Sequence, residues 1–557
     1  MSDRRSAGWA LPLLVLVLGT FLASLGTSII NVAISAIQRD FGGGIDAVRW
    51  VSTAYLLTLG ITTTTSSWLS ERFGATRVFL ACLIMFTIAS TLCGLAWDLN
   101  SLIAFRVLQA APGGVIPVVA MTLLFRLVPP DRVGGAMGLF GMGVILAPAL
   151  GPAVGGWLVE YATWPLVFFV MVPVGVLGII AALVIFPKGA ETTRPRFDTA
   201  GFVTIAAGLV ALTVATDRGP DWGWTSYGVL MLATVSLLCI ALFVVIEFEV
   251  DQPLIDPRVM RTWVYSNALV LISISAIGLF ALLYYVPQYL QTNKGYSSLD
   301  AGLLLMPSAL AMAFLAPIAG RMLDRFGPRW PVTIGLAVAA YGSILLAGIT
   351  PDVPRDKLIL WTTVRNVGVG LSMMPIMASG VAALPPSLIN AGSTLANVVM
   401  RTASSLGVAV FGGLQTAQHA QLMADRGALL AAGSGHAAPG ATGNSASVLA
   451  PMYQKLAQTV GTTTYANAFY LVAVMTAVGV VLALMLRSGP NRPAESRPAV
   501  PAGASPGAVA RDPVDVEPAG PPAPRLRDMR PAGAREPVPD RRPADQEIEL
   551  SPSAPRL

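Results

Sequence analysis

Long apolar runs recur along the chain between residues 11 and 486, and short polar segments separate them. A helix needs roughly 20 apolar residues to cross a bilayer, and each run is about that long. The pattern therefore predicts fourteen membrane-spanning helices, at 11–33, 47–69, 78–97, 101–124, 135–159, 165–186, 198–216, 226–247, 267–291, 299–320, 331–350, 358–383, 392–415 and 466–486. The break after the sixth run, at FPKGAETTRPRFD, is sharp, whereas the one after the twelfth, at LPPSLINAG, is weak.

The composition supports a polytopic membrane protein. Hydrophobic residues make up 54% of the 557 residues and charged residues only 12%, which is too little charge to cover a soluble chain of this length. The net charge of +6 is explained mostly by loops predicted to face the cytoplasm, so it does not indicate nucleic-acid binding. Cys82, Cys93 and Cys239 all fall within spans and are expected to pack as small apolar residues.

Lysine and arginine in the loops predict the orientation. With the amino terminus inside, the inward loops and terminus hold fourteen of them before the carboxyl-terminal tail, and the outward loops hold eight. The positive-inside rule therefore places both termini in the cytoplasm of a multi-pass protein of the bacterial inner membrane. The segment 488–557 is rich in Pro, Ala and Arg and is expected to be a disordered cytoplasmic tail.

The chain contains an internal repeat. SWLSERFGATR at 67–77 matches GRMLDRFGPRW at 320–330, 253 residues later, and Arg106 in FRVLQAAPGG matches Arg365 in VRNVGVG at nearly the same offset. Parallel repeats of this kind place the substrate site between two halves, near the membrane midplane. The predicted organisation is a cytoplasmic amino terminus (1–10), a six-helix bundle (11–186), a two-helix insertion (187–250) and a second six-helix bundle (251–487) with an outer loop at 416–465.

Four further stretches carry a resemblance to a known family: GLFGMGVILAPALGPAVGG (138–156), FDTAGFVTIAAGLVALTVATDRGPDWGW (197–224), YVPQYLQTNKGYSSLDAGLLLMP (285–307) and AGSTLANVVMRTASSLGVAV (391–410). With the loop motif, they make residues 8–487 resemble the fourteen-helix drug:proton antiporter branch (EmrB/QacA type) of the major facilitator superfamily. The resemblance implies an all-α major facilitator fold, with two six-helix bundles plus two inserted helices. It implies a secondary transporter in the lipid bilayer that exports small lipophilic substrates in exchange for protons. No cofactor, metal, nucleic acid or enzymatic activity is expected.

The repeated loop motif is a candidate inner gate. It comprises Glu71, Arg72 and Gly74 in the first half, and Asp324, Arg325 and Gly327 in the second. An acid at the amino end of the following helix would gain about 0.3–1 kcal/mol from the helix dipole. The arginines could then pair with it and latch two helices together at their inner ends. Alternatively, the arginines only set topology, on a tight turn where the glycines supply positive φ.

The fifth span carries the spacing that resembles the family's exporter motif: Gly138, Gly151, Pro152, Gly155 and Gly156, with Ala147 in place of a glycine. Small residues allow close helix approach, and prolines remove backbone hydrogen bonds and bend the helix. The expectation is a hinge-like seam packed against the facing bundle. The alternative is ordinary small-residue packing without motion.

Intramembrane arginines are further candidates. Each costs about 2.5–3.5 kcal/mol on insertion scales, and such residues are usually functional. Arg106 has Gln109 beside it on the helix, and Arg365 is its counterpart; Arg401 lies one turn from Asn397. The resemblance implies that Arg106 acts in proton transfer or substrate coupling. The alternative is that Arg106 snorkels to the outer interface, with Asp98 as its partner.

The first span carries a polar stripe, formed by Ser24, Thr27, Ser28 and Asn31 at helical spacing. These residues are expected to line the central cavity, although a Ser or Thr in a span often bonds only its own backbone. Further lining candidates, for which packing or an interfacial aromatic belt is the alternative, are Tyr55, Thr62, Tyr284 and Gln288.

Gly26 stands where the family pattern has an acid, in LASLGTSIINVAI. No Asp or Glu lies well inside any predicted span. Proton coupling is therefore either absent or carried by one of the acids at span ends: Asp46, Glu71, Asp98, Glu160, Asp198, Glu247, Asp300 or Asp324. Arginines without an embedded acid favour neutral, zwitterionic or anionic lipophilic cargo. The alternatives are an uncoupled facilitator, or a transport-dead receptor or lipid-handling protein.

Overall fold

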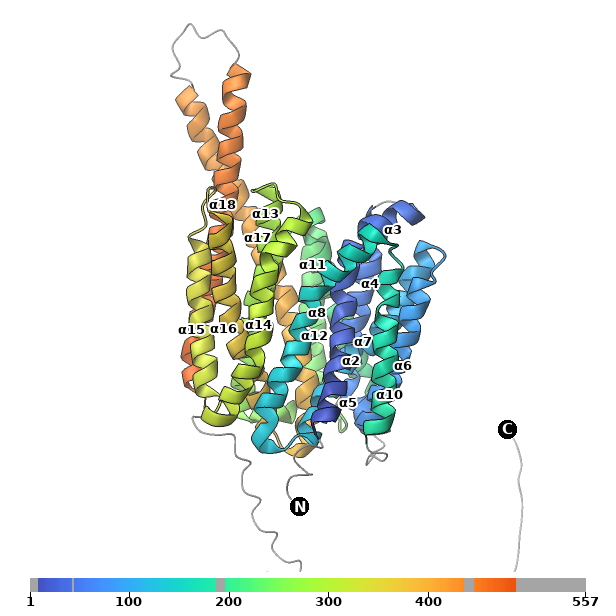
Figure 1. The fold of residues 1–557 in the computed structure, drawn as a ribbon. Helices are drawn as coiled ribbons and strands as arrows, with labels where there is room; N and C mark the ends of the chain where they lie inside the picture. Colours follow the sequence, from blue (N-terminus) through green and yellow to red (C-terminus); the bar gives the residue numbers. More distant parts are fainter. Residues whose placement is uncertain (1–8, 43–44, 187–195, 435–444, 487–557) are drawn as a thin grey trace, which may run out of the picture. The chain divides into compact units, whose positions relative to one another are not determined.

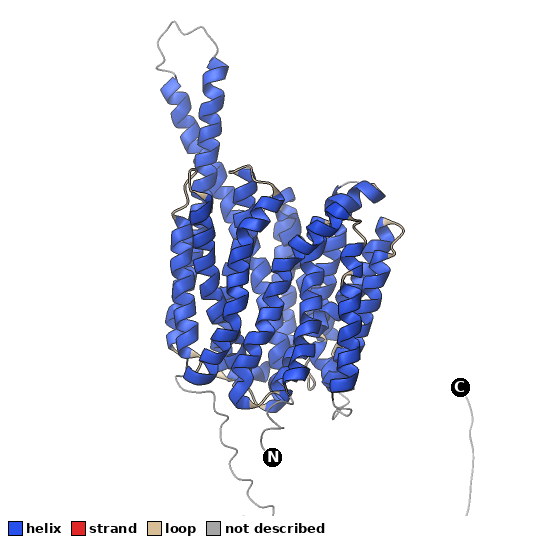
Figure 2. Cartoon of the chain, viewed as in Figure 1, coloured by secondary structure: helices blue, strands red, loops and turns tan. Residues whose placement is uncertain are grey.

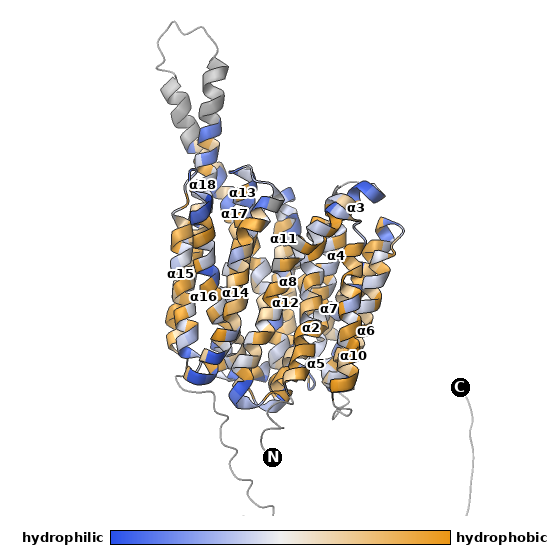
Figure 3. Ribbon diagram, in the orientation of Figure 1, coloured by the Kyte–Doolittle hydropathy of each residue, from blue (hydrophilic) through white to orange (hydrophobic). Residues whose placement is uncertain are grey.

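The computed structural model describes residues 9–42, 45–186, 196–434 and 445–486. All regular secondary structure in these ranges is helical, which confirms the predicted all-α class (Figure 2). Eleven helices in the described ranges are long and apolar enough to cross a membrane. Apolar residues run along the helix bodies and polar residues gather at the helix ends, as expected for helices in a bilayer (Figure 3).

The helices of the first half follow the first six predicted spans. The first span is broken into an α-helix, a 3₁₀ turn and a short α-helix, and the second ends in a π turn at Ser70–Gly74. The elements are α2 (Ala10–Ser28), η1 (Ile29–Val32), α3 (Ile34–Phe41), α4 (Ile45–Thr64), α5 (Ser66–Leu69), α6 (Ala75–Gly94), α7 (Leu99–Leu127), α8 (Val133–Tyr161), α9 (Leu166–Phe169) and α10 (Met171–Ile185).

The insertion and the second half follow the remaining eight predicted spans. The weakly marked break after the twelfth span is a 3₁₀ turn, η5 (Pro386–Leu388). The other elements are α11 (Thr199–Trp222), α12 (Tyr227–Glu249), η4 (Pro257–Arg261), α13 (Trp263–Thr292), α14 (Ser298–Phe326), α15 (Arg329–Ala347), α16 (Arg355–Ala382), α17 (Ile389–Ser434) and α18 (Ser445–Leu484).

The prediction that residues 416–465 form a loop is wrong for most of that segment. Most of this segment continues the two helices, because α17 extends to Ser434 and α18 begins at Ser445. Figure 1 shows both helices running past the ends of their neighbours. Hydropathy shows where the apolar part of each helix ends, but it does not show where the helix itself ends. Alanine-rich polar sequence can remain helical beyond the apolar part.

The internal repeat is visible in the packing. In the first half α7 packs against α4 and α6, and in the second half α16 packs against α14 and α15. The halves meet where α8 packs against α14, and where α17 packs against α4 and α7 (Figure 1). Each junction therefore includes the helix that leads into one copy of the repeated loop motif, α14 or α4.

The insertion contacts both halves, because α11 packs against α4 and also against α17. Toward its carboxyl end, Asp221 pairs with Arg49 at 2.6 Å, and Thr53 donates a hydrogen bond to Asp217 at 3.2 Å. The ring of Trp224, just after α11, covers Gly412 so closely that a Cβ there would lie 2.5 Å from it. The two inserted helices are thus attached to both bundles.

Candidate functional site

Arg106 on α7 is fully buried inside the first half. Its Nη1 donates to Oε1 of Gln109 at 2.7 Å, and its Nη2 donates to the carbonyl oxygen of Gly26 at 3.1 Å. Its Nε donates to the carbonyl oxygen of Val51 at 3.4 Å. The guanidinium also lies 3.8 Å from the centroid of the Tyr55 ring, in cation–π geometry. Neutral acceptors and a ring therefore hold this cation in place.

Gln109 connects the hydrogen-bond network of Arg106 to α6. Its Nε2 donates to Oγ of Ser90 on α6 at 2.6 Å. Ser90 itself donates to the carbonyl oxygen of Phe86, one turn earlier. The chain of hydrogen bonds thus connects α2, α4, α6 and α7 through one arginine, and it rigidifies the centre of the first half.

The snorkelling alternative for Arg106 is wrong. Asp98 instead caps α7, where its Oδ1 accepts from the backbone nitrogen of Ser101 at 2.7 Å. The hydrogen bonds with Ser101 lower the pKa of the Asp98 carboxyl. Arg106 turns away from the outer interface because buried carbonyl groups of α2 and α4 offer it partners inside the bundle.

Gly26 is the place where the family pattern expects an acid, and the packing leaves no room for a side chain there. A Cβ on Gly26 would lie 2.9 Å from the hydroxyl oxygen of Tyr55 and 3.2 Å from the ring of Phe86. The Gly26 carbonyl meanwhile accepts from Arg106. The backbone of α2 therefore supplies the acceptor, and the tyrosine fills the space that a carboxylate would need.

Gly26→Ala is expected to lower the free energy of unfolding by about 1–3 kcal/mol, the usual effect of overpacking a filled core. Tyr55→Phe in the same chain should recover part of that loss, because it removes the oxygen that the new methyl group meets. Thermal unfolding of the detergent-solubilised protein measures both effects. Gly60→Ala is the matched control, since nothing lies within 4 Å of its Cβ position; equal losses at both glycines would contradict the packing argument.

Arg365 on α16 is buried in the second half in a related arrangement. Its Nε donates to Oγ of Ser343 on α15 at 3.2 Å, and its Nη1 lies 3.4 Å from Oδ1 of Asn366. The Asn366 amide donates to Ser308 on α14 at 3.0 Å. A Cβ on Gly278 of α13 would lie 2.9 Å from Nη2 of Arg365. The arginine again faces a glycine on the first helix of its half.

The two arginine sites share three sequence equivalences, at offsets of 252, 253 and 259 residues: Gly26 with Gly278, Ser90 with Ser343, and Arg106 with Arg365. The serines escaped the sequence-based prediction, although their spacing matches the offset of the loop motif. At the offset of the arginines, Gln109 corresponds to Gly368, whose missing side chain brings α16 close to Ala339 of α15. The second arginine therefore reaches its serine directly.

Asn397 and Arg401 bring α17 of the second half to the first half. Asn397 donates to the carbonyl oxygen of Ser393 at 2.9 Å, and its amide lies 3.9 Å from the sulfur of Met121 on α7. Arg401 lies near Tyr55, and its buried Nε has no hydrogen-bond partner. Tyr55 thus lies near two arginines, one from each half.

The polar stripe on the first span is interrupted. The α-helix ends at Ser28, and Asn31 falls on the 3₁₀ turn η1, where its side chain is outside the described residues. Thr27 donates to the carbonyl oxygen of Ser24 at 2.6 Å. Ser28 lies 3.3 Å from the carbonyl oxygen of Ala147 on α8. Ser24, Thr27 and Ser28 thus lie on α2, and the place of Asn31 in the stripe stays a prediction.

The other candidate lining residues lie in different surroundings. Thr62 donates to Thr58 of its own helix at 2.9 Å, which is the self-bonding alternative. Tyr284 is 39% exposed and packs edge-on against Tyr285 at 5.1 Å. Gln288 is partly buried, and its Oε1 has no hydrogen-bond partner. Their role in a substrate cavity stays a prediction.

Asp324 joins the two halves at their inner ends, the ends predicted to face the cytoplasm. Its Oδ1 accepts from the backbone nitrogen of Gly134 at 2.7 Å, and its Oδ2 accepts from that of Gly135 at 2.6 Å. Asp324 lies in the last turn of α14, and the two nitrogens belong to the first turn of α8. The expected dipole interaction is present, but with α8 of the other half rather than with the helix that follows the motif.

Glu71 makes the equivalent contact in the other repeat. Asn390, at the start of α17, donates to Oε1 of Glu71 at 3.4 Å and accepts from Arg126 of α7 at 3.2 Å. Polar residues of the first half therefore meet the start of a second-half helix. Asn390, Gly134 and Gly135 escaped the prediction because nothing in their local sequence shows which distant carboxylate or amide they meet.

The remaining gate residues form the turns. Gly74 and Gly327 both have positive φ, 87° and 77°, as predicted for tight turns. Arg72 lies 5.9 Å from the centroid of the Trp68 ring, and Arg325 lies 5.4 Å from that of Phe326. The acids thus make the contacts between halves that are seen here, while these two arginines lie over aromatic rings.

The exporter motif on α8 packs against two different partners. Gly138 lies against Ala316 and Pro317 of α14, in the facing half. Gly151 and Gly155 instead lie against the junction of α2 and η1 in their own half, and Gly156 has open space beside it. The side chain of Pro152 is outside the described residues. The expected seam against the facing bundle is therefore correct at Gly138 and wrong at Gly151 and Gly155.

Comparison with known proteins agrees with this architecture. A sequence profile of the Major Facilitator Superfamily matches residues 16–408. The chain is 32% identical over 433 residues to the multidrug resistance protein B homolog of Mycobacterium tuberculosis (strain ATCC 25618 / H37Rv), covering 76% of this chain and 79% of that one. It is 29% identical over 426 residues to the tetracenomycin C resistance and export protein of Streptomyces glaucescens, with the same coverage of 76% and 79%.

A solved structure shares the fold. The proton:xylose symporter XylE bound to 6-bromo-6-deoxy-D-glucose aligns with a TM-score of 0.57 at 13% identity, covering 88% of this chain and 98% of that one. At this identity the similarity supports the fold alone. The profile match covers the first bundle, the insertion and most of the second bundle, and it confirms the resemblance drawn from the loop and span motifs. The chain belongs to the major facilitator superfamily and is a multi-pass membrane transporter.

Proposed function

We propose that this transporter exports amphipathic small molecules by alternating access, in exchange for protons, with both termini in the cytoplasm. Two of its relatives are named for multidrug resistance or for the resistance to and export of tetracenomycin C. Their names and the exporter-type spacing on α8 support the direction of transport. The fold supports alternating access, because it consists of two repeated bundles that meet along α8, α14 and α17.

The contact of Asp324 with α8 is the observation that carries this proposal. Two hydrogen bonds from backbone nitrogens to one carboxylate join the halves at their inner ends, and the Glu71–Asn390 contact lies at the equivalent place in the other repeat. A small number of polar contacts can break and reform as rigid bodies rock. Substrate or proton binding needs only a few kcal/mol of differential affinity to shift such an equilibrium.

The arginines favour cargo without multiple positive charges. Arg106 and Arg365 are buried in the two halves, and Arg401 lies beside Tyr55 at their junction. In the described helices the acidic residues lie toward the helix ends rather than in the central turns. We therefore expect neutral, zwitterionic or anionic lipophilic substrates, and poor transport of dications such as bis-quaternary biocides.

The first experiment is uptake of a neutral lipophilic fluorescent drug into inside-out vesicles, with and without an inside-acid pH gradient. Gradient-driven accumulation is the expected result, and a bis-quaternary dye under the same gradient should accumulate poorly. Saturable equilibration that ignores the gradient would instead indicate an uncoupled facilitator. Absence of saturable uptake would contradict export and favour a receptor or lipid-handling protein, whose phenotype should then depend on residues 488–557.

A further inference from the structure

Asp198 and Glu247 are the most buried acidic side chains in the described part of the chain, 8% and 4% exposed. Asp198 caps α11 and Glu247 lies in the last turn of α12, so both are in the insertion at its inner end. The contacts between the halves described above use neither residue. Their burial away from the junction of the halves calls for a separate explanation.

Each carboxylate is satisfied at one oxygen only. Oδ1 of Asp198 accepts from the backbone nitrogen of Gly201 at 2.9 Å, and Oε2 of Glu247 accepts from that of Ile255 at 3.2 Å. Oδ2 of Asp198 and Oε1 of Glu247 are buried and have no partner. A Cβ built on Gly201 would touch both of these oxygens. The two unpartnered oxygens therefore converge beside one glycine.

Among the described residues, no base forms a hydrogen bond or ion pair with these two oxygens. The pair adjoins an apolar cluster of α11, α12, the following linker and α17, which includes Ile205, Phe243 and Val398. The charged groups nearby in the described residues are the acids Asp256 and Glu249, the exposed bases Arg196, Arg258 and Arg261, and Arg72, which lies over the Trp68 ring. Two adjacent buried negative charges would repel each other strongly here.

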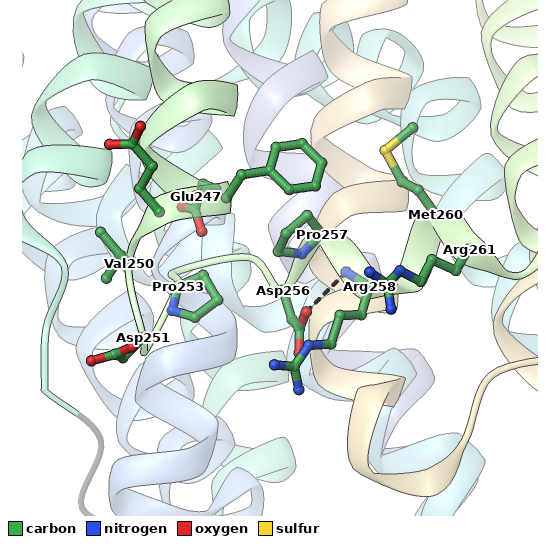
Figure 4. A pocket seen from close by; sticks show the side chains of 11 residues that line it. Glu247, Val250, Asp251, Pro253, Asp256, Pro257, Arg258, Met260 and Arg261 are labelled. Atoms are coloured by element: carbon green, nitrogen blue, oxygen red, sulfur yellow. Dashed lines mark hydrogen bonds between the residues drawn. The ribbon is translucent and has the colours of Figure 1, made fainter.

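We propose that Asp198 and Glu247 form a proton-binding site, in which one protonated carboxyl donates its hydrogen to the other's unpartnered oxygen. A single proton then satisfies both oxygens and removes one of the two negative charges. Glu247 also lines an open pocket of about 510 Å³ between α12 and η4, which brings water to the Glu247 side of the pair (Figure 4). The proton comes from and returns to that water, so no other reactant is needed.

The site joins three segments of the chain. Asp198 begins α11, Glu247 ends α12, and Ile255 belongs to the linker that leads into the second bundle. The shared proton holds these segments together, and its loss leaves two repelling charges that loosen the linker. The pair is thus a pH-sensitive clasp between the insertion and the second bundle, and it requires no transport to operate.

Thermal unfolding of the full-length protein in detergent, measured across a pH series, tests the clasp. Above the titration of an unfolded Glu, the folded protein still holds the shared proton that the unfolded chain has released, so Tm should fall as pH rises. The double variant D198N/E247Q should lose that fall, and E247Q alone should reduce it. E249Q is the matched control, since Glu249 is exposed on the same helix and should leave the pH dependence unchanged.

Infrared difference spectroscopy gives a second readout that does not depend on stability. A carbonyl stretch from a protonated carboxylic acid is expected near neutral pH in the wild type and in E249Q, and it should be lost in D198N/E247Q. Identical bands and pH profiles in the wild type and the double variant would overturn the proposal. So would a Tm increase with Na⁺ at fixed pH that the double variant loses, because a cation would then occupy the site. Both the Tm profile and the infrared band can be interpreted whether or not D198N/E247Q still transports.

Discussion

Arg106→Ala is expected to lower the initial rate of drug uptake into inside-out vesicles by at least about tenfold. The substitution leaves Oε1 of Gln109 without its charged donor and removes the additional donor of the Gly26 and Val51 carbonyls, inside a fully buried site. Each buried polar group left unsatisfied costs about 1–3 kcal/mol, and 1.4 kcal/mol corresponds to a factor of ten. The lost hydrogen bonds are those that connect α2, α4, α6 and α7. Without them the bundle loses the rigidity that it needs to rock as one body.

Arg106→Lys separates charge from geometry. Lysine retains the positive charge but offers a compact ammonium in place of a planar fork, so it cannot stack on Tyr55 while reaching Gly26 and Gln109. An intermediate rate is expected. Arg355→Ala, at an exposed position on α16, should leave uptake unchanged at equal protein amounts. Full activity of Arg106→Ala would show that the network serves neither transport nor its coupling, and wild-type rates for Arg106→Lys would show that charge alone suffices.

The sequence was sufficient to predict the helices, because hydropathy reports directly on the lipid environment of each segment. All fourteen predicted spans correspond to helical segments among the described residues. The repeat also predicted that Arg106 and Arg365 are equivalent. A buried arginine needs hydrogen-bond partners, and the equivalent serines Ser90 and Ser343 belong to the hydrogen-bond networks of the two arginines.

Contacts between distant segments could not be predicted in this way. The position of Gly26 suggested a missing acid, whereas the structure shows a space filled by Tyr55 and a backbone carbonyl bound to Arg106. The stripe from Ser24 to Asn31 assumed a continuous α-helix, but α2 gives way to a 3₁₀ turn after Ser28. Periodicity describes one helix at a time, while these features depend on which other helix lies against it.

The contacts of the inner gate also join segments that are distant in the sequence. Asp324→Asn should shift the conformational equilibrium toward separated inner ends by about 30-fold. An asparagine has one acceptor oxygen, so only one of the Gly134 and Gly135 nitrogens keeps its bond, and that bond loses its charge. Hydrogen bonds to charged groups contribute about 1.5–3 kcal/mol, and a loss of about 2 kcal/mol gives this factor. The amide nitrogen of Asn would also face a backbone donor.

Spin labels on Arg77→Cys of α6 and Arg321→Cys of α14, both at exposed positions, report the distance between the inner ends. Asp324→Asn should raise the population at long distance, and Asp131→Asn should not. Asp131 is the matched control, because it is an exposed acid immediately before α8 and pairs only with exposed Arg132 among the contacts seen here. An unchanged distance distribution in Asp324→Asn would mean that the apolar contact of α8 with α14 holds the inner ends closed by itself. A shift in both variants would mean that overall negative charge at this face, rather than the cap on α8, sets the equilibrium.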